Sequence, residues 1–299
     1  MTTQLASFHN HTRYSDGTFK VEELVEQVHR LNQRLLRERD AVIRGVAIVD
    51  HDFYPPEAEI HRLREHAARF GIELAFGTEI SADSAQVHII GYEIDTSNYA
   101  FFRYMVREHY KRLEAFEDTC RRLNKLFERE GRSVDLDRDV GPQALKRDEA
   151  GRVVGYGPLR WHYLRVAMVR RGMARDTKEA NVLIGPGGPC YHQRETMNSV
   201  EVVERILEWG GKPVLAHPHK IPEAFRDRVI RSLIEAGLWG IEAYSASYHE
   251  PEERNRYVKL AREHGLVVLA GTDLHGEEVE EVLRFLLPYE AFLRLIQRG

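Results

Sequence analysis

The sequence has little cysteine, no long apolar run and no excess of positive charge. Its 299 residues include only two cysteines, Cys120 and Cys190, which excludes a disulfide framework and a cysteine-based zinc finger. The longest unbroken apolar run, Leu266 to Ala270, is far too short to cross a membrane. The N-terminus lacks a basic region followed by an apolar core, so we expect no signal peptide and a cytoplasmic location.

The formal net charge is −4 at pH 7. This mild acidity argues against a basic surface for long duplex nucleic acid, although it is compatible with a local positive groove around bound metals. Histidine, in contrast, is plentiful, with fifteen residues. Because imidazole is a common metal ligand and a common acid or base, metal chemistry is the first function to consider.

Strands and helices alternate in the first part of the chain. A strand over residues 6–11 places His9 and His11 on one face, and an amphipathic helix begins near Val21. Later strands are expected at 45–49, 72–77 and 86–92, with a helix at 57–70 between the first two. This pattern indicates a parallel sheet or barrel, in which functional groups collect at the carboxyl ends of the strands.

The alternation of strands and helices stops near residue 95 and resumes at residue 200. Between these points, long helices are predicted at 99–131 and 159–171. Strands follow again at 213–216, 240–244 and 266–271. We therefore expect an α/β core made of residues 1–95 and 200–299, with residues 96–199 as a mainly helical insertion that carries substrate-binding residues.

Nine potential metal ligands lie on or directly after the predicted strands. They are His9, His11, Asp16, His51, Glu79, His88, His217, Asp273 and His275. One ion does not need so many nitrogen and oxygen donors, so the pattern predicts two or three metal ions. A mixed histidine and carboxylate set suits Mn²⁺, Fe²⁺ or Zn²⁺. Asp50 and Asp52 flank a ligand histidine, either to orient a ring or as ordinary loop carboxylates.

These motifs resemble those of the PHP family of phosphoesterases, named for polymerase and histidinol phosphatase. The resemblance rests on segments that follow one another in order through both core parts: Phe8-His9-Asn10-His11, Ser15-Asp16-Gly17, Asp50-His51-Asp52, Gly77-Thr78-Glu79-Ile80-Ser81, His88-Ile89-Ile90-Gly91-Tyr92, Ala216-His217-Pro218 and Asp273-Leu274-His275. It implies a distorted (β/α)₇ barrel with a trinuclear metal site.

The resemblance also implies how the ligands are shared among three ions. His9, His11, Glu79 and Asp273 would hold the first ion, and Glu79 would bridge to a second ion held by His88 and His217. Asp16, His51 and His275 would hold the third. Hydrolysis of a phosphoester by a metal-bridging hydroxide follows from such a site. His219 is the candidate general acid.

The insertion is similar to that of the PHP subgroup that removes the 3′-phosphate from 3′,5′-nucleoside bisphosphates and trims short RNA from its 5′ end. The matching segments are Gly157-Pro158-Leu159-Arg160-Trp161-His162 and Gly187-Gly188-Pro189-Cys190-Tyr191. Trp161 stands where the subgroup usually has proline. Arg160 and His162 are the candidates for binding a substrate phosphate, and a surface ion pair is the alternative for Arg160.

Three functions follow from the sequence. The favoured one is a metal-dependent phosphoesterase that acts on a small nucleotide or short RNA, without a membrane or long duplex partner. A histidinol-phosphate phosphatase would use the same chemistry on another substrate. A non-catalytic, metal-stabilised accessory module is the third, and it fits the full ligand set least well. The sequence does not indicate an oligomeric state.

Overall fold

The computed structural model describes residues 2–83, 87–147, 153–156, 159–192, 195–245, 251–276 and 279–297. The chain divides into two compact units. The first is formed by Met1–Arg103 and Thr196–Gly299, and the second by Tyr104–Glu195.

The first unit is built on a sheet whose eight described strands follow the order β10-β1-β2-β3-β4-β7-β8-β9. The strands in chain order are β1 (Thr3–Asn10), β2 (Ala41–His51), β3 (Glu73–Ala82), β4 (Val87–Tyr92), β7 (Lys212–Leu215), β8 (Gly240–Ser245), β9 (Val267–Gly271) and β10 (Leu287–Pro288).

The chain beyond β9 returns to β1 and brings the two sides of the sheet together. Thr272 N–H donates to Phe8 O at 3.3 Å, and His11 N–H donates to Leu274 O at 3.0 Å. Asn10 and Leu274 also form a parallel bridge. These contacts make a nearly closed barrel, so the predicted distorted α/β barrel is confirmed.

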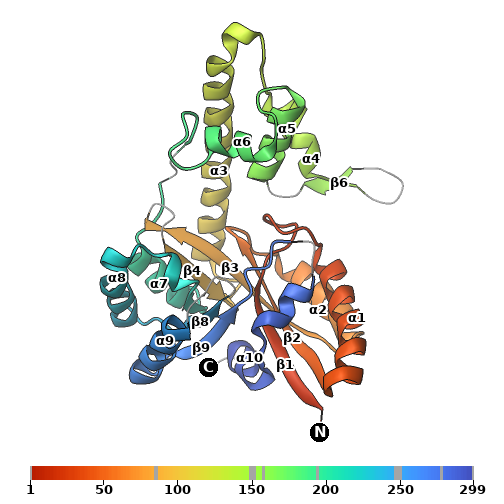
Figure 1. The fold of residues 1–299 in the computed structure, drawn as a ribbon, viewed down its shortest axis with the longest axis vertical. Helices are drawn as coiled ribbons and strands as arrows, with labels where there is room; N and C mark the ends of the chain where they lie inside the picture. Colours follow the sequence, from red (N-terminus) through yellow and green to blue (C-terminus); the bar gives the residue numbers. More distant parts are fainter. Residues whose placement is uncertain are drawn as a thin grey trace. The chain divides into compact units, whose positions relative to one another are not determined.

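Helices surround this barrel on its outer side (Figure 1). They are α1 (Val21–Arg39), α2 (Glu57–Ala68), α7 (Ser199–Glu208), α8 (Glu223–Glu235) and α9 (Pro251–His264). Helix α1 buries one apolar stripe, which includes Leu24, Val28 and Leu31. Its first turn is fixed because Lys20 N–H donates to Glu23 Oε2 at 2.8 Å.

The sheet departs from the parallel pattern at β4, as it does at β10. Strand β4 runs antiparallel to β3, with Glu79 opposite Ile90, and antiparallel to β7, with Ile89 opposite Leu215. Only four residues, 83–86, separate β3 from β4, and a parallel crossover needs a dozen or more. The reversal brings His88 and Ser81 opposite each other near the end of β3.

The chain end adds β10 and a short helix, α10 (Tyr289–Ile296), which the sequence pattern did not reveal. Phe292 of α10 is fully buried and its ring lies 6.1 Å from that of Phe8 in β1. Gly45 of β2 makes room for it, since a Cβ there would lie 2.5 Å from Phe292 Cγ. Helix α10 therefore packs into the barrel core together with β1 and β2.

The second unit is mainly helical. Helix α3 (Tyr99–Leu126) begins in the first unit and continues into this one, where α4 (Gly141–Ala144), α5 (Trp161–Arg170), α6 (Thr177–Ile184) and a hairpin of β5 (Leu145–Arg147) and β6 (Val153–Tyr156) follow. Its core includes both cysteines and a stacked pair, Phe116 and Trp161, whose ring centroids lie 4.1 Å apart. No helix in the described part of the chain has the length and apolar character to cross a membrane.

Candidate metal centre

The nine predicted ligands come together at one end of the barrel, where β1, β2, β3, β4, β7 and β9 bring them from distant parts of the sequence. Three groups of side chains have ligand atoms within 4.8 Å of one another. They are His9 with His11, Glu79 and Asp273; His51 with Glu79 and His88; and His11 with Asp16, His51 and His275. Glu79, His11 and His51 each belong to two groups, so the three groups overlap.

The first group lies deep in the barrel. Glu79 Oε2 is 3.2 Å from His9 Nε2 and 3.3 Å from His11 Nε2. Asp273 Oδ1 is 3.4 Å from His11 Nε2 and 3.7 Å from His9 Nε2. Both histidines and Glu79 are almost completely buried, so two imidazole rings and a carboxylate face one another away from the protein surface.

Two imidazoles lie at the other oxygen of Glu79: His88 of the second group and His217, which is not part of the three groups. His88 Nδ1 and His217 Nε2 each lie 2.8 Å from Glu79 Oε1, and their ring centroids are 5.0 Å apart. His51 Nδ1 lies 3.1 Å from Oε2. Because Glu79 uses both oxygens on different sets of imidazoles, it is placed to serve two ions at once.

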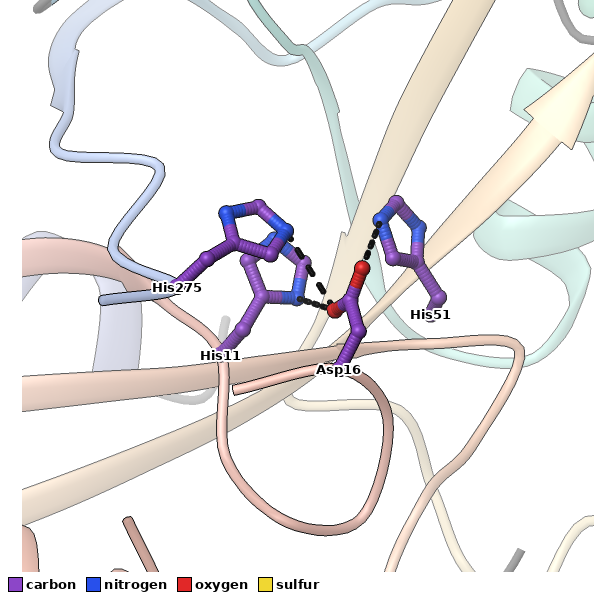
Figure 2. Close-up of side chains that lie close together, drawn as sticks. All are labelled: His11, Asp16, His51 and His275. Atoms are coloured by element: carbon purple, nitrogen blue, oxygen red, sulfur yellow. Dashed lines mark ion pairs between the residues drawn. The ribbon is translucent and has the colours of Figure 1, made fainter. Parts of the chain in front are cut away.

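The third group is shown in Figure 2, where the Asp16 carboxylate points toward three imidazole rings. Asp16 Oδ1 is 3.3 Å from His275 Nε2 and 3.8 Å from His11 Nδ1, and its Oδ2 is 4.0 Å from His51 Nε2. His11 stacks between the other two rings, with centroids 4.6 Å from His51 and 4.1 Å from His275. Asp16 is the most exposed member of the cluster.

The surroundings of Glu79 Oε2 indicate whether the cluster fits metal ions. This atom is buried and accepts no hydrogen bond, although three imidazole nitrogens lie 3.1–3.3 Å from it. An unsatisfied buried carboxylate oxygen is costly. A cation between these atoms would satisfy the oxygen and the ring nitrogens together, so the donor set fits divalent metal ions.

Burial and neighbouring charges shift the pKa values of the cluster. Burial disfavours the ionised form of Glu79, but the imidazoles of His51 and His9 outweigh it and hold its pKa well below the ordinary value. Burial also opposes protonation of His11, yet contacts with Asp273 and Glu79 raise its pKa to about 9. His51 differs, because burial dominates and lowers its pKa to about 4. Strong shifts of both signs in one cluster are typical of functional sites.

Three of the nine side chains project from a backbone that L-residues rarely adopt. His9, His217 and Asp273 have φ angles of 58°, 25° and 52°. Such conformations cost free energy and persist where the surrounding structure holds them. Here they turn side chains at the ends of β1, β7 and β9 toward a common point.

Asp50 holds the loop that carries Asp16. It accepts hydrogen bonds from Thr12 N–H at 2.8 Å, from Thr12 Oγ1 at 2.7 Å and from Ser15 Oγ at 2.6 Å. Ser15 Oγ in turn lies 3.3 Å from His11 Nδ1. Asp50 therefore acts on the loop rather than directly on a histidine ring. The neighbouring Asp52 has a φ of 47°, and its N–H donates to Glu79 O at 3.2 Å.

Two residues of the site were not identified from the sequence. Glu242 of β8 is fully buried, and its Oε1 lies 2.8 Å from His9 Nδ1. Lys220 Nζ lies 2.7 Å from Asp273 Oδ2 and is half-exposed. A charged residue inside the otherwise apolar strand 240–244 was a signal for Glu242, whereas nothing in the local pattern singled out Lys220.

The remaining candidates lie outside the cluster of nine. The His219 ring centroid is 6.3 Å from that of His217, and burial lowers the His219 pKa to about 4, which leaves the ring neutral at pH 7. A neutral ring is a poor proton donor, so this pKa does not favour the general-acid role. That role of His219 stays a prediction.

The phosphate-binding candidates belong to the second unit. The Arg160 guanidinium lies 5.2 Å from the centre of the Tyr163 ring and donates to its hydroxyl at 3.4 Å. His162 is exposed, and burial together with Arg165 and Arg160 lowers its pKa. Their proposed contact with phosphate stays a prediction. Gly157 and Pro158 of the same motif lie outside the described residues.

Comparisons with known proteins place the chain among phosphoester hydrolases. No family model matches the chain. It is 27% identical over 277 residues to a 3′,5′-nucleoside bisphosphate phosphatase from Chromobacterium violaceum, covering 90% of this chain and 86% of that protein. It is 26% identical to the 5′-3′ exoribonuclease Rnm of Escherichia coli, over 89% of this chain and 84% of the relative. A phosphoribosyl 1,2-cyclic phosphate 1,2-diphosphodiesterase from Eggerthella lenta is also 26% identical, over 91% of this chain and 95% of that protein.

Solved structures share the fold. A protein from Bifidobacterium adolescentis described as a metal-dependent phosphoesterase superposes with a TM-score of 0.73 at 23% identity and covers 100% of this chain and 97% of its own. An amidohydrolase from Chromobacterium violaceum, solved with bound sulfate and no metal, gives a TM-score of 0.69 at 23% identity and covers 98% of each chain. Together with the sequence relatives, these matches confirm the predicted resemblance.

Proposed function

We propose that this chain, a metal-dependent phosphoester hydrolase related to PHP-type enzymes, acts on a 3′,5′-nucleoside bisphosphate or a short oligoribonucleotide. The observation that carries the proposal is the sharing of Glu79 and His11 between overlapping groups of ligands. Closely spaced ions held by shared ligands are the arrangement that phosphoester hydrolysis uses.

The chain would hold two to three divalent ions, and Mn²⁺, Fe²⁺ and Zn²⁺ all suit its ligands. The nine ligands would divide as the resemblance implies, with Glu79 shared between the first two ions. Ions bound there would supply Lewis-acid stabilisation of phosphate charge and a lowered pKa for bound water.

The chain's own residues would orient the substrate. Lys220 is half-exposed, and its ammonium group reaches a carboxylate of the cluster, so a substrate phosphate oxygen near Asp273 would be within its reach. Arg160 and His162 would bind a substrate phosphate, since guanidinium pairs well with phosphate oxygens.

The names of the relatives support a nucleotide or ribosyl substrate. One relative is a nucleoside bisphosphate phosphatase and another an exoribonuclease, and each aligns along most of this chain. The Eggerthella lenta relative adds a ribosyl cyclic phosphodiester as a second candidate, because it aligns over 95% of its own length. A cytoplasmic location is part of this proposal.

Phosphate release with Mn²⁺ tests the proposal. The substrates are adenosine 3′,5′-bisphosphate, a short 5′-phosphorylated RNA, phosphoribosyl 1,2-cyclic phosphate and histidinol phosphate, each with and without chelator. Because the first cleavage of the cyclic ester or of the RNA gives a phosphomonoester and no free phosphate, chromatography of the products accompanies the phosphate assay. We expect Mn²⁺-dependent turnover of the bisphosphate or the RNA.

Each other result has a defined meaning. Turnover of histidinol phosphate alone would contradict the nucleotide assignment, and turnover of the cyclic ester alone would favour the second candidate. No product from any of the four substrates with Mn²⁺ would contradict the enzyme assignment and favour an accessory module.

A further inference from the structure

We infer that Glu242 is a positioning residue that fixes two metal ligands, His9 and His217, on either side of Glu79. This inference rests on the proposed function and extends it to a residue outside the nine ligands. Glu242 lies in β8 and is fully buried. A buried carboxylate is costly unless its oxygens accept hydrogen bonds, so its partners indicate its role.

Both oxygens of Glu242 accept a hydrogen bond from a different ligand residue. His9 Nδ1 lies 2.8 Å from Oε1, and the His217 backbone N–H donates to Oε2 at 2.8 Å. A carboxylate that accepts the Nδ1 proton fixes the ring tautomer and leaves the Nε2 lone pair for a metal. His9 Nε2 indeed faces Glu79 Oε2, at 3.2 Å.

The second hydrogen bond acts on the backbone. His217 has a φ of 25°, an unusual conformation for a residue with a side chain. Its N–H is held by Glu242 while its ring reaches Glu79 Oε1 at 2.8 Å. Glu242 therefore stabilises the strained turn that aims this ring.

Only a carboxylate satisfies both partners. His9 Nδ1–H and the His217 backbone N–H both donate to Glu242, whereas a glutamine of the same shape offers one acceptor oxygen and one donor NH₂. In Glu242→Gln, the NH₂ group faces either the His217 N–H, donor against donor, or His9 Nδ1, which can accept only if the ring proton moves to Nε2, the atom that faces Glu79. The variant thus disturbs either His9 or His217 with almost no change in volume.

Gly271 of β9 provides the space that Glu242 occupies. A Cβ at this position would lie 2.5 Å from Glu242 Cδ, far closer than non-bonded carbon atoms approach. Alanine at position 271 would displace the carboxylate without changing its chemistry. Gly271→Ala is therefore an independent way to perturb the same two hydrogen bonds.

The experiment measures Mn²⁺ binding and kinetics of the full-length chain. Free Mn²⁺ is followed by electron paramagnetic resonance during titration of each protein. The proteins are the wild type, the single variants Glu242→Gln, Gly271→Ala and Glu242→Ala, and the double variant Glu242→Ala/Gly271→Ala. Glu108→Gln is the matched control, because Glu108 is also a buried carboxylate, in the second unit, and lies 3.2 Å from Lys111. Thermal unfolding in EDTA checks that each variant is folded.

We expect Glu242→Gln and Gly271→Ala to bind Mn²⁺ about 10–100-fold more weakly at the sites that share Glu79, since residues that orient metal ligands have effects of this size. We also expect kcat to fall by a similar factor at saturating Mn²⁺, with KM near that of the wild type. Gly271→Ala should have no further effect when Glu242 is already alanine, because the clash is then gone. Glu108→Gln should bind Mn²⁺ like the wild type.

Wild-type Mn²⁺ affinity and stoichiometry in folded Glu242→Gln would overturn the inference. If that variant does not fold, Gly271→Ala decides, and wild-type binding in folded Gly271→Ala would overturn it equally. Mn²⁺ binding is measured without substrate, so the result stands even if no tested phosphoester is hydrolysed. Failure of the inference and failure of the proposed function are thus separate outcomes.

Discussion

His11 is the residue on which the candidate metal centre most depends. Its Nε2 faces Glu79 and Asp273, while its Nδ1 lies near Ser15 and Asp16. No neutral substitute offers two nitrogen atoms on opposite sides of a rigid ring. The loss of this one side chain would therefore affect two groups of ligands.

We expect His11→Ala to lower kcat by about 100-fold or more, because even residues that only orient ligands contribute 10–100-fold. The fold should persist, since most of the barrel core lies away from this ring. Phosphate release and far-ultraviolet circular dichroism measure the two effects. A folded variant with the wild-type rate would refute the role of His11.

Among single residues, the sequence indicated the candidate ligands better than the residues that contact and orient them. His9, His51 and Asp273 were recognisable because their residue types rarely recur at strand ends by chance. Glu242 and Lys220 contact the cluster only through folding that joins β8 and the turn after β7 to β1 and β9. Such contacts between distant segments leave little trace in local sequence periodicity.

The elements of the barrel were predictable where apolar patterns are strong, as in α1. The strand β4 was also predicted, but its antiparallel direction was not. Helix α10 was missed because it is short, and its buried Phe292 could equally have belonged to a strand. The Phe292 ring packs against the rings of Phe8 and Tyr289, with centroids 6.1 and 5.7 Å away. This packing indicates that Phe292 contributes much to the stability of the barrel.

Phe292→Ala is expected to lower the free energy of unfolding by about 3–5 kcal/mol, the usual cost of removing a buried aromatic side chain. Urea denaturation at constant temperature measures this change. Leu36→Ala is the control, because Leu36 of α1 is 46% exposed and its loss should change stability by less than about 0.5 kcal/mol. Equal stability of the two variants would show that α10 contributes little to the barrel.

Helix α3 carries an acid-sensitive contact in the second unit. The hydrogen bond with His192, at 2.8 Å, and the nearby Arg121 and Arg122 lower the pKa of Asp118 to about 2. A lowered pKa in the folded state stabilises the protein above the unfolded-state value near 4. This contribution is lost as the pH falls through 2.

Asp118→Asn should therefore destabilise the protein at pH 5, and the difference from the wild type should shrink between pH 4 and pH 2. Because the group lies near the surface, high salt should reduce the effect. Chemical denaturation at several pH values follows it, with Glu114→Gln, an exposed carboxylate variant on the same helix, as the control. If the stability difference between Asp118→Asn and the wild type stays constant from pH 5 to pH 2, the contact between Asp118 and His192 does not contribute as described.

At the scale of the whole molecule, the ligands come from both ends of the chain. His9 and Asp273 are close in space although most of the sequence lies between them. The sequence predicted that residues 200–299 complete the barrel, because strands and helices alternate again after residue 200. The boundaries 96–199 for the insertion stay a prediction, because the change from barrel to insertion occurs within the continuous helix α3, where periodicity gives no signal.

Metal removal should destabilise the first unit and leave the second nearly unchanged, because all nine candidate ligands lie in the first. Mn²⁺ at about 100 times its dissociation constant stabilises the folded state by about 2.7 kcal/mol. For a unit of this size the gain corresponds to a Tm about 5–10 °C higher with Mn²⁺ than with EDTA. Differential scanning calorimetry measures the shift, and hydrogen exchange should locate the loss of protection in β1 and β3 rather than in α5 and α6. His11→Ala is the control and should lose most of the response to Mn²⁺, whereas an equal shift in that variant would mean that Mn²⁺ stabilises the protein from another site.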